Sequence, residues 1–317
     1  MKKILVTGAA GFIGSHTCDA LLARGDSVVG VDNFDSFYDP AIKRRNLAGA
    51  LANERFSLHE LDITDEPALV RVFEAARPDV VVHLAARAGV RPSLEDPNLY
   101  HRVNIIGSQH VLDACRHYPV SHLVFASSSS VYGGITETPF RETMTCDRPV
   151  SPYAATKRMN ELMAHVYHHV YGLKVTLLRF FTVYGPRQRP EMAIHKFTRL
   201  IDEGANVPMF GDGSSRRDYT FIDDILDGLL KAVDTPLDYE IFNLGESHTT
   251  SLYGLIGMLG EILGKQVNIQ PLPFPPSDME TTFADISKAR RMLGYDPQTT
   301  IRDGLARFVD WYREQET

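Results

Sequence analysis

Cysteine and tryptophan are scarce in this chain, which has three cysteines and one tryptophan among 317 residues. The cysteines, Cys18, Cys115 and Cys146, are far apart and follow no metal-ligand spacing. Disulfide scaffolds and zinc modules need more cysteines at closer intervals. We therefore expect three packing thiols, with neither a disulfide framework nor a metal site.

The chain also lacks a long apolar run and an excess of basic residues. Its first six residues resemble the start of a secretion signal, but Thr7 and Gly8 interrupt them, and no stretch reaches the ~18 apolar residues of a membrane helix. The formal charge is -7, whereas nucleic-acid binding depends on clustered lysine and arginine. These absences predict a cytoplasmic protein that binds neither membrane nor nucleic acid, although a few arginines suffice for a small anion.

Short β-branched runs alternate with helical patterns through the first half, the rhythm of a parallel sheet covered on both faces. The predicted strands are residues 3–7, 27–32, 56–60, 79–84, 122–126 and 174–181. The predicted helices are residues 12–24, 66–76, 98–116 and 153–171. This order predicts an α/β fold with a Rossmann-like doubly wound parallel sheet.

Proline, glycine and polar clusters become frequent after residue 185. Helical patterns there cover residues 252–263, 286–293 and 301–312, and the proline-rich run 271–276 predicts an extended loop. We expect a Rossmann domain at 1–180, with contributions from about 218–245. A smaller mixed α/β lobe is expected at 181–317, interleaved with it.

Three glycines follow the first predicted strand, in the run GAAGFIG at residues 8–14. Gly8 permits a tight turn, Gly11 lets backbone N–H groups approach a pyrophosphate at the helix N-terminus, and Gly14 allows close packing. Glycines alone are weak evidence, because an ordinary turn has the same composition. Asp32 strengthens the case for NAD over NADP, since a carboxylate there accepts from the adenosine ribose and repels a 2′-phosphate.

Further cofactor contacts are expected at the neighbouring strand ends. Asp62 follows the third strand, where the adenine edge would lie, although a turn or helix-capping role is the alternative. Small residues end the fourth strand and leave room for the cofactor. The predicted NAD-binding residues are Gly8, Gly11, Phe12, Ile13, Gly14, Asp32, Asn33, Asp62, Ile63, Leu84, Ala85, Ala86, Tyr153 and Lys157.

Tyr153 and Lys157 stand four residues apart at the start of a predicted helix, so both lie on one helix face. A lysine ammonium and a positive nicotinamide ring favour phenolate and lower the tyrosine pKa from about 10. Tyr153 can then act as a base near neutral pH. The serine run 127–130 ends the fifth strand and offers a hydroxyl for the same hydrogen-bond network.

These motifs resemble those of extended short-chain dehydrogenase/reductases, in the NAD-dependent sugar-nucleotide epimerase family, with UDP-glucuronate and UDP-glucose 4-epimerases most similar. The likeness runs through TGAAGFIG, SSSSVYGG, SPYAATK, RFFTVYGPRQRPEMA, RRDYTFIDD and TFADISKARRMLGY. It implies that Tyr153 is the catalytic base and acid, that Lys157 binds the nicotinamide ribose, and that Ser128 assists proton transfer. Ser127 and Ser129 are less favoured, because Ser128 has the family's spacing from the following VYG.

Related dehydratases and decarboxylases carry acidic residues in the strand-end motif, where this chain has Ser129 and Ser130. The resemblance therefore implies 4-epimerisation through a transient 4-keto intermediate, with NAD regenerated and retained. A dehydratase or reductase is an alternative, but its acids are missing. A non-catalytic NAD sensor of the same fold is another, but it would not need the intact catalytic residues.

The run FFTVYGPRQRPEMA is similar to that of UDP-glucuronate 4-epimerases, in which a threonine and nearby hydroxyls receive the sugar carboxylate. This favours conversion of UDP-glucuronate to UDP-galacturonate. UDP-glucose and UDP-galactose are the alternative substrates, because this chain lacks the sequence GPWGRPDMA that is common in UDP-glucuronate 4-epimerases. Arg217 matches a diphosphate-binding arginine and Asp278 a ribose-contacting position. The predicted substrate-binding residues are Arg91, Ser128, Ser129, Thr182, Arg189, Arg217 and Asp278, and Arg87 lies on the same loop as Arg91.

His165, His168 and His169 have a spacing that can chelate a metal. They lie far along the helix from Tyr153, so surface or dimer-face positions are the favoured interpretation. The resemblance implies a homodimer joined by a four-helix bundle of the helices at 98–116 and 153–171.

Overall fold

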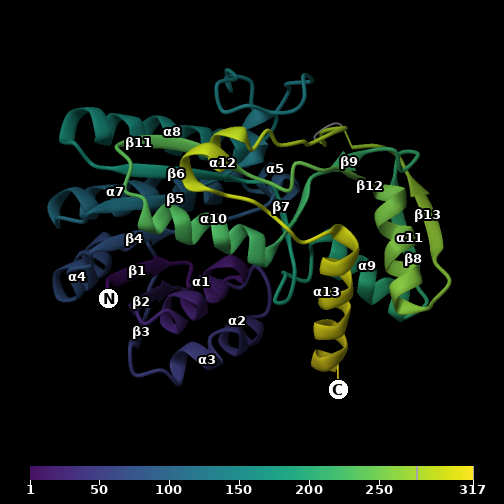
Figure 1. Cartoon of the computed structure of the whole chain (residues 1–317), viewed down its shortest axis with the longest axis horizontal. Coiled ribbons are helices and arrows are strands. Elements are labelled where there is room, and N and C mark those ends of the chain that lie inside the picture. The colour runs from purple at the N-terminus through teal and green to yellow at the C-terminus, as the bar shows by residue number, and fades with distance from the viewer. Residues whose placement is uncertain (276–277, 317) are drawn as a thin grey trace. The chain divides into compact units, whose positions relative to one another are not determined.

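The computed structural model describes residues 1–275 and 278–316, and the chain divides into two compact units, each assembled from separate stretches of sequence. Unit 1 consists of Met1–Ile135, Thr145–Arg179 and Gly228–Phe242. Unit 2 consists of Thr136–Met144, Phe180–Asp227 and Asn243–Thr317. Figure 1 shows the course of the chain, coloured by residue number.

Unit 1 is built around a seven-stranded sheet, in the strand order β11-β6-β5-β4-β1-β2-β3. Its strands are β1 (Lys3–Thr7), β2 (Ser27–Asp32), β3 (Phe56–Glu60), β4 (Val80–His83), β5 (His122–Ser128), β6 (Val175–Phe180) and β11 (Tyr239–Leu244). β1 pairs in parallel with both β2 and β4, and the strand order reverses there. The predicted Rossmann-like fold is confirmed, with β11 as a seventh strand that we did not predict. Loops after β1, β2 and β4 meet at the edge where open α/β sheets bind ligands.

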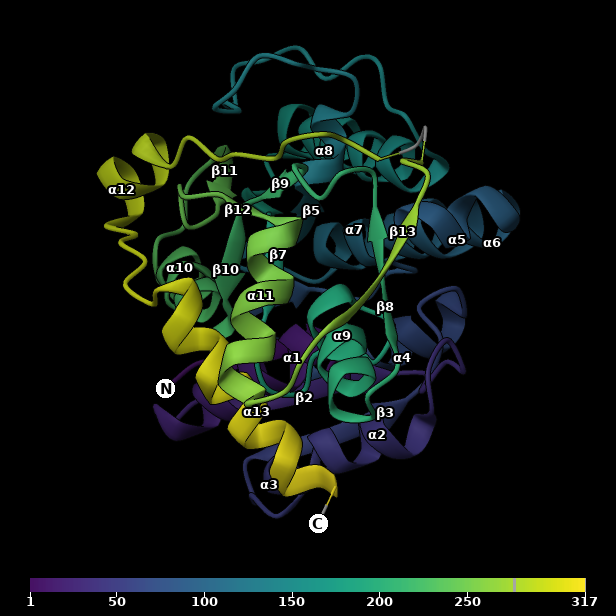
Figure 2. The same ribbon diagram turned by 90° about the vertical axis from the view of Figure 1, so that its right-hand side faces the viewer.

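Helices cover both faces of this sheet. The helices of unit 1 are α1 (Phe12–Ala23), α2 (Pro40–Asn46), α3 (Ala48–Leu51), α4 (Glu66–Ala76), α5 (Val90–Glu95), α6 (Pro97–Tyr100), α7 (Ser108–His117) and α8 (Pro152–Tyr171), and α10 (Ile222–Asp234) begins in unit 2 and continues into unit 1 at Gly228. One buried apolar core joins alternate strand residues such as Leu5, Val81 and Leu123 to Phe73 of α4 and Leu112 of α7. Right-handed crossovers place α1 on the opposite face. Helices α7 and α8 lie side by side in both views (Figures 1 and 2).

The predicted helix at 98–116 is only partly correct. The structure divides this stretch into α6, a π-helical segment η1 (His101–Gly107) and α7. A π-helical turn holds an extra residue and is set by packing rather than by apolar periodicity. At Gly107 a Cβ atom would approach Ile63 Cδ1 to 2.7 Å, so a close contact fixes this part of the helix.

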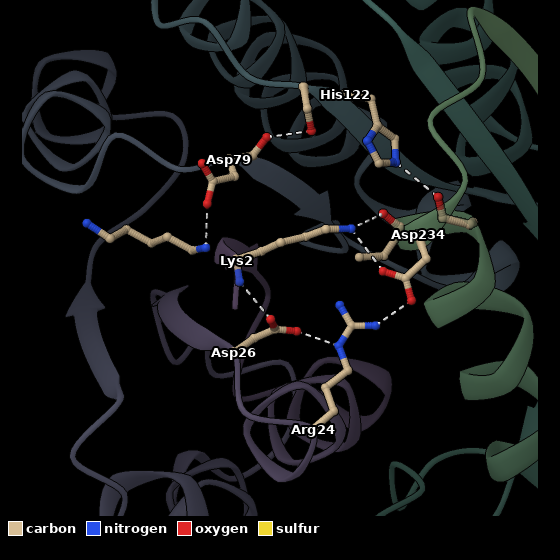
Figure 3. Close-up of polar contacts among 10 residues, drawn as sticks. Lys2, Arg24, Asp26, Asp79, His122 and Asp234 are labelled. Carbon is tan, nitrogen blue, oxygen red and sulfur yellow. Dashed lines mark hydrogen bonds and ion pairs between the residues drawn. The ribbon is translucent and has the colours of Figure 1, made fainter.

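Ion pairs join Asp234, in the Gly228–Phe242 stretch, to the residue before β1 and to the C-cap of α1 (Figure 3). Lys2 Nζ donates to Asp234 Oδ1 at 2.9 Å, and Arg24 Nη1 donates to Asp234 Oδ2 at 2.8 Å. On β5, His122 Nε2 lies 3.0 Å from the backbone oxygen of Ala232. Residues more than two hundred positions apart in sequence thus belong to one unit.

Unit 2 consists of small sheets and short helices. Its elements are β7 (Thr182–Tyr184), α9 (Ala193–Asp202), β8 (Asn206–Phe210), β9 (Arg216–Arg217), β10 (Tyr219–Phe221), β12 (Thr250–Ser251), α11 (Leu252–Leu263), β13 (Asn268–Leu272), α12 (Ser287–Leu293) and α13 (Ile301–Glu316). The strands pair two by two, as β10-β7, β12-β9 and β13-β8.

The predicted loop at 271–276 is wrong at its beginning, because Pro271 and Leu272 belong to β13 and Pro271 pairs with Met209 of β8. Proline is compatible with an edge strand, and both strands of a two-stranded sheet are edges. The end of this run, at residue 276, lies outside the described residues.

The three cysteines all fall within the described residues, and each is a buried free thiol there. Burial raises the pKa of the Cys115 and Cys146 thiols, so both stay protonated. Over residues 1–275 and 278–316, no helix combines the length and apolar character needed to cross a membrane.

Candidate active site

The glycine-rich turn after β1 is too tightly packed for side chains at two positions. Gly8 has a φ of 71°, and a Cβ there would lie 2.8 Å from the backbone nitrogen of Ala85. A Cβ on Gly14 would lie 1.9 Å from the Gly8 carbonyl oxygen. Two predicted cofactor segments, the turn after β1 and the loop after β4, are therefore in direct contact.

The N-terminus of α1 fits a pyrophosphate. Gly11 is its N-cap and provides no side-chain acceptor for the first-turn N–H groups, which include those of Phe12 and Ile13. Unpartnered N–H groups at a helix N-terminus form an anion site, reinforced by the helix dipole. The backbone at Gly11–Ile13 is thus suited to hold the diphosphate of NAD.

Asp32, at the end of β2, is buried and already accepts two backbone hydrogen bonds. Its Oδ2 accepts from Ala10 N at 2.9 Å, and its Oδ1 accepts from Phe34 N at 2.8 Å. Burial raises the pKa of Asp32, and the hydrogen bonds from Phe34 and Ala10 oppose this rise. The carboxylate links the glycine-rich turn to the end of β2, where the adenosine ribose is expected.

Asn33 and Asp62 are joined at the ends of β2 and β3. Asn33 Nδ2 donates to Asp62 Oδ2 at 2.8 Å, and Asp62 Oδ1 accepts from Thr64 N at 2.8 Å. Burial raises the pKa of Asp62, but hydrogen bonds from Thr64 and Asn33 outweigh burial and lower it overall. Asp62 forms a turn with Thr64, which is one of the two roles given above as the alternative to adenine binding. The other role, helix capping, belongs to Asp65, which is the N-cap of α4.

A hydrogen-bonded chain that sequence reasoning missed connects the loop after β4 to the first turn of α8. Arg87 forms an ion pair with Asp35, and its backbone N donates to Asn104 Oδ1 at 2.7 Å. Asn104 Nδ2 donates to Thr156 Oγ1 at 3.0 Å, and Thr156 Oγ1 donates to the backbone oxygen of Tyr153 at 2.8 Å. Asn104 lies inside the π-helical segment η1, a feature often found at functional sites.

Tyr153 and Lys157 occupy the first two turns of α8, which begins at an N-cap, Ser151, that accepts from Ala154 N at 3.1 Å. The Tyr153 ring is half-buried and meets the Tyr100 ring edge-on, with 6.2 Å between centroids. Lys157 is buried, and its Nζ donates to the backbone oxygen of Ala126 on β5 at 2.8 Å. Burial lowers the pKa of Lys157 to about 8.

The serine run at the end of β5 has side chains that lie in two directions. Ser128 is half-buried, and its Oγ accepts from Ser130 N at 3.2 Å, which starts the 3-10 helix η2 (Ser129–Tyr132). Ser127 Oγ instead donates to Glu161 Oε1 at 2.7 Å inside the core. Lys157 thus reaches the strand two residues before Ser128, and Ser127 is already engaged elsewhere.

The predicted substrate residues lie in both units. Arg91, in unit 1, is exposed on the first turn of α5, and Ser129 begins η2. In unit 2, Thr182 starts β7 and its N donates to the Asp218 carbonyl at 3.1 Å. The remaining three come from separate segments of unit 2: Arg189 pairs with Glu191 at 3.2 Å, Arg217 Nη1 donates to the Arg216 carbonyl at 2.9 Å, and Asp278 N donates to the Pro275 carbonyl at 3.1 Å.

Comparison with known proteins identifies the family of this chain. A model of the NAD dependent epimerase/dehydratase family matches residues 4–245. The chain belongs to this family.

Relatives in the family match over nearly the whole chain. The UDP-glucuronate 4-epimerase of Thermodesulfobacterium geofontis is 44% identical over 315 residues, which cover 99% of this chain and 97% of the relative. The crystal structure of UDP-glucuronic acid 4-epimerase from Bacillus cereus, in complex with UDP-glucuronic acid and NAD, is 39% identical with a TM-score of 0.94 over 99% of each chain. UDP-glucose 4-epimerase of Thermotoga maritima, solved with UDP-glucose, is 35% identical with a TM-score of 0.92, over 99% of this chain and 100% of that one.

Family membership confirms the predictions of an NAD-dependent enzyme and of NAD as its cofactor. The histidines of α8 make ring contacts: His165 stacks on His169 at 6.2 Å and meets the Tyr239 ring edge-on at 5.1 Å. Within the described residues, no group of three or more histidine, cysteine, aspartate or glutamate side chains is placed to hold a metal ion.

Proposed function

We propose that this protein is a UDP-glucuronate 4-epimerase, which interconverts UDP-glucuronate and UDP-galacturonate with NAD bound throughout. The observation that supports it best is the similarity, over almost the full chain, to enzymes named for this reaction. The local chemistry agrees, because Ser129 and Ser130 stand where an elimination or decarboxylation would need a carboxylate.

In this proposal Tyr153 accepts the proton of the sugar 4-hydroxyl and later returns it. NAD, when bound, supplies the acceptor and donor of the hydride at carbon 4. Lys157 donates one of its three N–H groups to Ala126 O. It has two more, one for the nicotinamide ribose and one directed toward the Tyr153 phenol. Its positive charge favours the Tyr153 phenolate. Ser128 provides a hydroxyl that passes the proton between the sugar and Tyr153.

The sugar carboxylate is assigned to hydroxyl groups of Thr182, Ser128 and Ser129, with Arg189 as a neighbouring cation. Arg217 is assigned to the diphosphate and Asp278 to the uridine ribose. Arg91 is a further candidate for the sugar or phosphate. Uncharged hydroxyl donors suit a carboxylate, because a hydrogen bond to a charged group contributes ~1.5–3 kcal/mol.

The second candidate substrate is UDP-glucose or UDP-galactose, supported by the similarity to the Thermotoga maritima enzyme solved with UDP-glucose. The decisive experiment incubates the purified protein with a panel of UDP-sugars, without added NAD, and identifies products by NMR. We expect UDP-glucuronate to be preferred by about tenfold to a hundredfold in kcat/KM. Equal or faster turnover of UDP-glucose or UDP-galactose would replace the uronate proposal with this alternative.

Thr182→Val tests the carboxylate assignment, because valine keeps the shape and removes the hydroxyl. We expect the preference for UDP-glucuronate over UDP-glucose to fall by about tenfold. Thr198→Val is the matched control, since Thr198 is buried on α9 and its hydroxyl has no hydrogen-bond partner among the described residues. A Thr182→Val enzyme with unchanged preference would remove Thr182 from the site.

We also propose a homodimer that uses α8. Four apolar side chains on this helix are 44% to 58% exposed and recur at intervals of three or four residues: Met159, Leu162, Val166 and Val170. Such a stripe on a helix is typical of a helix–helix interface. We expect Val166→Arg to convert the dimer to monomer in sedimentation experiments. A wild-type protein that sediments as a monomer would refute the proposal.

A further inference from the structure

Glu161 and Arg179 form a buried ion pair one helical turn beyond Lys157. Arg179 Nε and Nη2 donate to the two Glu161 carboxylate oxygens, each at 2.8 Å, and the side chains are 0% and 1% exposed. Arg158 Nη1 adds a third bond at 2.9 Å. Desolvation offsets most of the attraction in a buried pair, so such a pair is weak evidence for stability and calls for another explanation.

The pair contacts the strand end on both sides of Ser128. On one side, Ser127 Oγ donates to Glu161 Oε1 at 2.7 Å. On the other, the Arg179 guanidinium lies over the Tyr132 ring, 4.8 Å from its centroid, at the end of η2. The residues before and after Ser128 are therefore held by one ion pair.

The pair also fixes the catalytic helix. Glu161 follows Tyr153 by eight residues and Lys157 by four, so all three lie on one side of α8. Lys157 binds Ala126 O, and Glu161 binds Ser127 Oγ, so two successive residues of β5 are joined to two successive turns of α8. A shift of the helix along the strand would break both bonds.

We propose that Glu161, together with Arg179, is a positioning residue for the epimerase reaction, which sets the register between the helix of Tyr153 and Lys157 and the strand end of Ser128. This inference rests on the proposed function, in which those three residues carry the proton. Catalysis depends on such register, because a general base must lie within hydrogen-bond reach of the proton it takes.

The charge of Glu161 also acts on Lys157. Burial lowers the pKa of Lys157 to about 8, and the Glu161 carboxylate opposes this. Burial lowers the pKa of His83, which faces Lys157 from β4, to about 3 and keeps it neutral. The groups around Glu161 itself are Arg158, Arg179, Ser127, Cys146 and Tyr239. Without the Glu161 charge, the two arginines would be uncompensated and would disfavour the Lys157 ammonium. Lys157 would then lose its proton at a lower pH, so the loss of activity on the alkaline side should begin at a lower pH.

The test compares two variants. Glu161→Gln keeps the shape of the side chain and removes its charge, whereas Ser127→Ala removes only the hydrogen bond between Ser127 of β5 and Glu161 of α8. For Ser127→Ala we expect a kcat about tenfold lower, an unchanged KM and an unchanged pH profile. For Glu161→Gln we expect a kcat about a hundredfold lower and an alkaline limb shifted by about one pH unit to lower pH. Glu261→Gln is the control, because it removes an exposed ion pair with Arg302.

A purely structural role would lower the melting temperature without changing kcat per folded molecule or the pH profile, and that result would overturn the proposal. If Glu161→Gln does not fold, Ser127→Ala decides alone: kcat within twofold of wild type would refute positioning. A second measurement separates the two proposals. The ionisation of Tyr153 is followed as the difference in ultraviolet absorbance between the enzyme and its Tyr153→Phe variant, with NAD and without sugar. A wild type inactive on UDP-glucuronate refutes the function, whereas an unshifted titration in Glu161→Gln refutes the positioning role.

Discussion

Glu161 in unit 1 and Asp218 in unit 2 are both buried carboxylates, but they are stabilised differently. In unit 1, burial raises the pKa of Glu161, but the hydrogen bonds and charge of Arg179 outweigh burial and hold it low. In unit 2, Asp218 accepts from the backbone N–H groups of Glu246, Ser247 and Ala284, and burial raises its pKa to about 6. At Glu161 a cationic partner outweighs burial, whereas at Asp218 the backbone hydrogen bonds lower the pKa but do not outweigh burial.

The neighbours of Asp218 extend this difference. Burial raises the pKa of Glu246 to about 8, with the charges of Asp224 and Asp218 acting in the same direction. Asp224 accepts from Gln298 N at 2.8 Å. Unit 2 thus holds acids whose protonation changes near neutral pH, whereas Glu161, on α8 in unit 1, keeps its charge.

The largest effect is expected from Tyr153→Phe, because the catalytic base is assigned to unit 1. Turnover should fall by ~10²–10⁴-fold, since only the proton acceptor is lost, while UDP-sugar binding stays largely intact. Steady-state kinetics and calorimetric binding measure the two effects. Tyr171→Phe, at the exposed end of the same helix, is the control. A Tyr153→Phe enzyme with more than about a tenth of wild-type turnover would exclude Tyr153 as the base.

The next effect is on the stability of unit 2. In Asp218→Asn, an NH₂ group replaces one carboxylate oxygen and faces backbone N–H donors, because each oxygen of Asp218 accepts from at least one of them. Leaving such donors without an acceptor costs about 1–3 kcal/mol each, so we expect a loss of roughly 2–4 kcal/mol in urea unfolding. Asp212→Asn, on an exposed turn, should change little. Equal stability of the two variants would contradict this account of Asp218.

Asp32→Ala should weaken NAD retention by about tenfold to a hundredfold, because the ribose loses a charged acceptor and Ala10 N loses its partner. Cofactor content of the purified protein and the rate of NAD exchange are the measurements. Asp310→Ala, on the exposed face of α13, is the control for the loss of one carboxylate. Predominant NADP in the wild-type protein would contradict the assignment of Asp32.

The smallest effect concerns pH. The pKa of Glu246 is about 8 in the folded protein, against about 4.3 in an unfolded chain. The folded state therefore binds the proton more tightly, and the stability this provides, complete below about pH 4, is lost as pH rises through 8. In Glu246→Gln this loss is absent, so between pH 6 and 9 the variant should lose about 1 kcal/mol less than wild type. Parallel stability profiles would show that Glu246 does not titrate in this range.

Sequence patterns predicted the sheet of unit 1 better than the rest. The bounds of β1, β2, β3 and α4 were predicted to the residue, because buried parallel strands are short apolar runs and α4 begins at a capping aspartate. In unit 2, the bounds of α11 were also predicted to the residue. β11 was missed because its place in the sheet depends on pairing with distant β6. The small sheets of unit 2 were missed for the same reason, since two- or three-residue strands such as β9 and β7 have no periodicity to detect.

Motif spacing gave the candidate catalytic and NAD residues, but not the network around them. Glu161 looks like one more polar residue on an amphipathic helix, and only the fold reveals that it is buried. A signal was nonetheless present: Arg179 is the single charge in the strand sequence VTLLRF, and an arginine within a buried strand requires a partner. No such signal marks Asn104, because the direction of its side chain depends on the π-helical turn.

The late position of β11 in the chain has a consequence for synthesis on the ribosome. β6 ends at Phe180, and its neighbour β11 begins only at Tyr239, after the Phe180–Asp227 stretch that belongs to unit 2. The nascent chain therefore exposes the unpaired backbone edge of β6 while this stretch is translated, and such an edge invites association with other chains. Neither unit corresponds to one continuous gene fragment, so truncation after β6 would leave unit 1 with that edge permanently open.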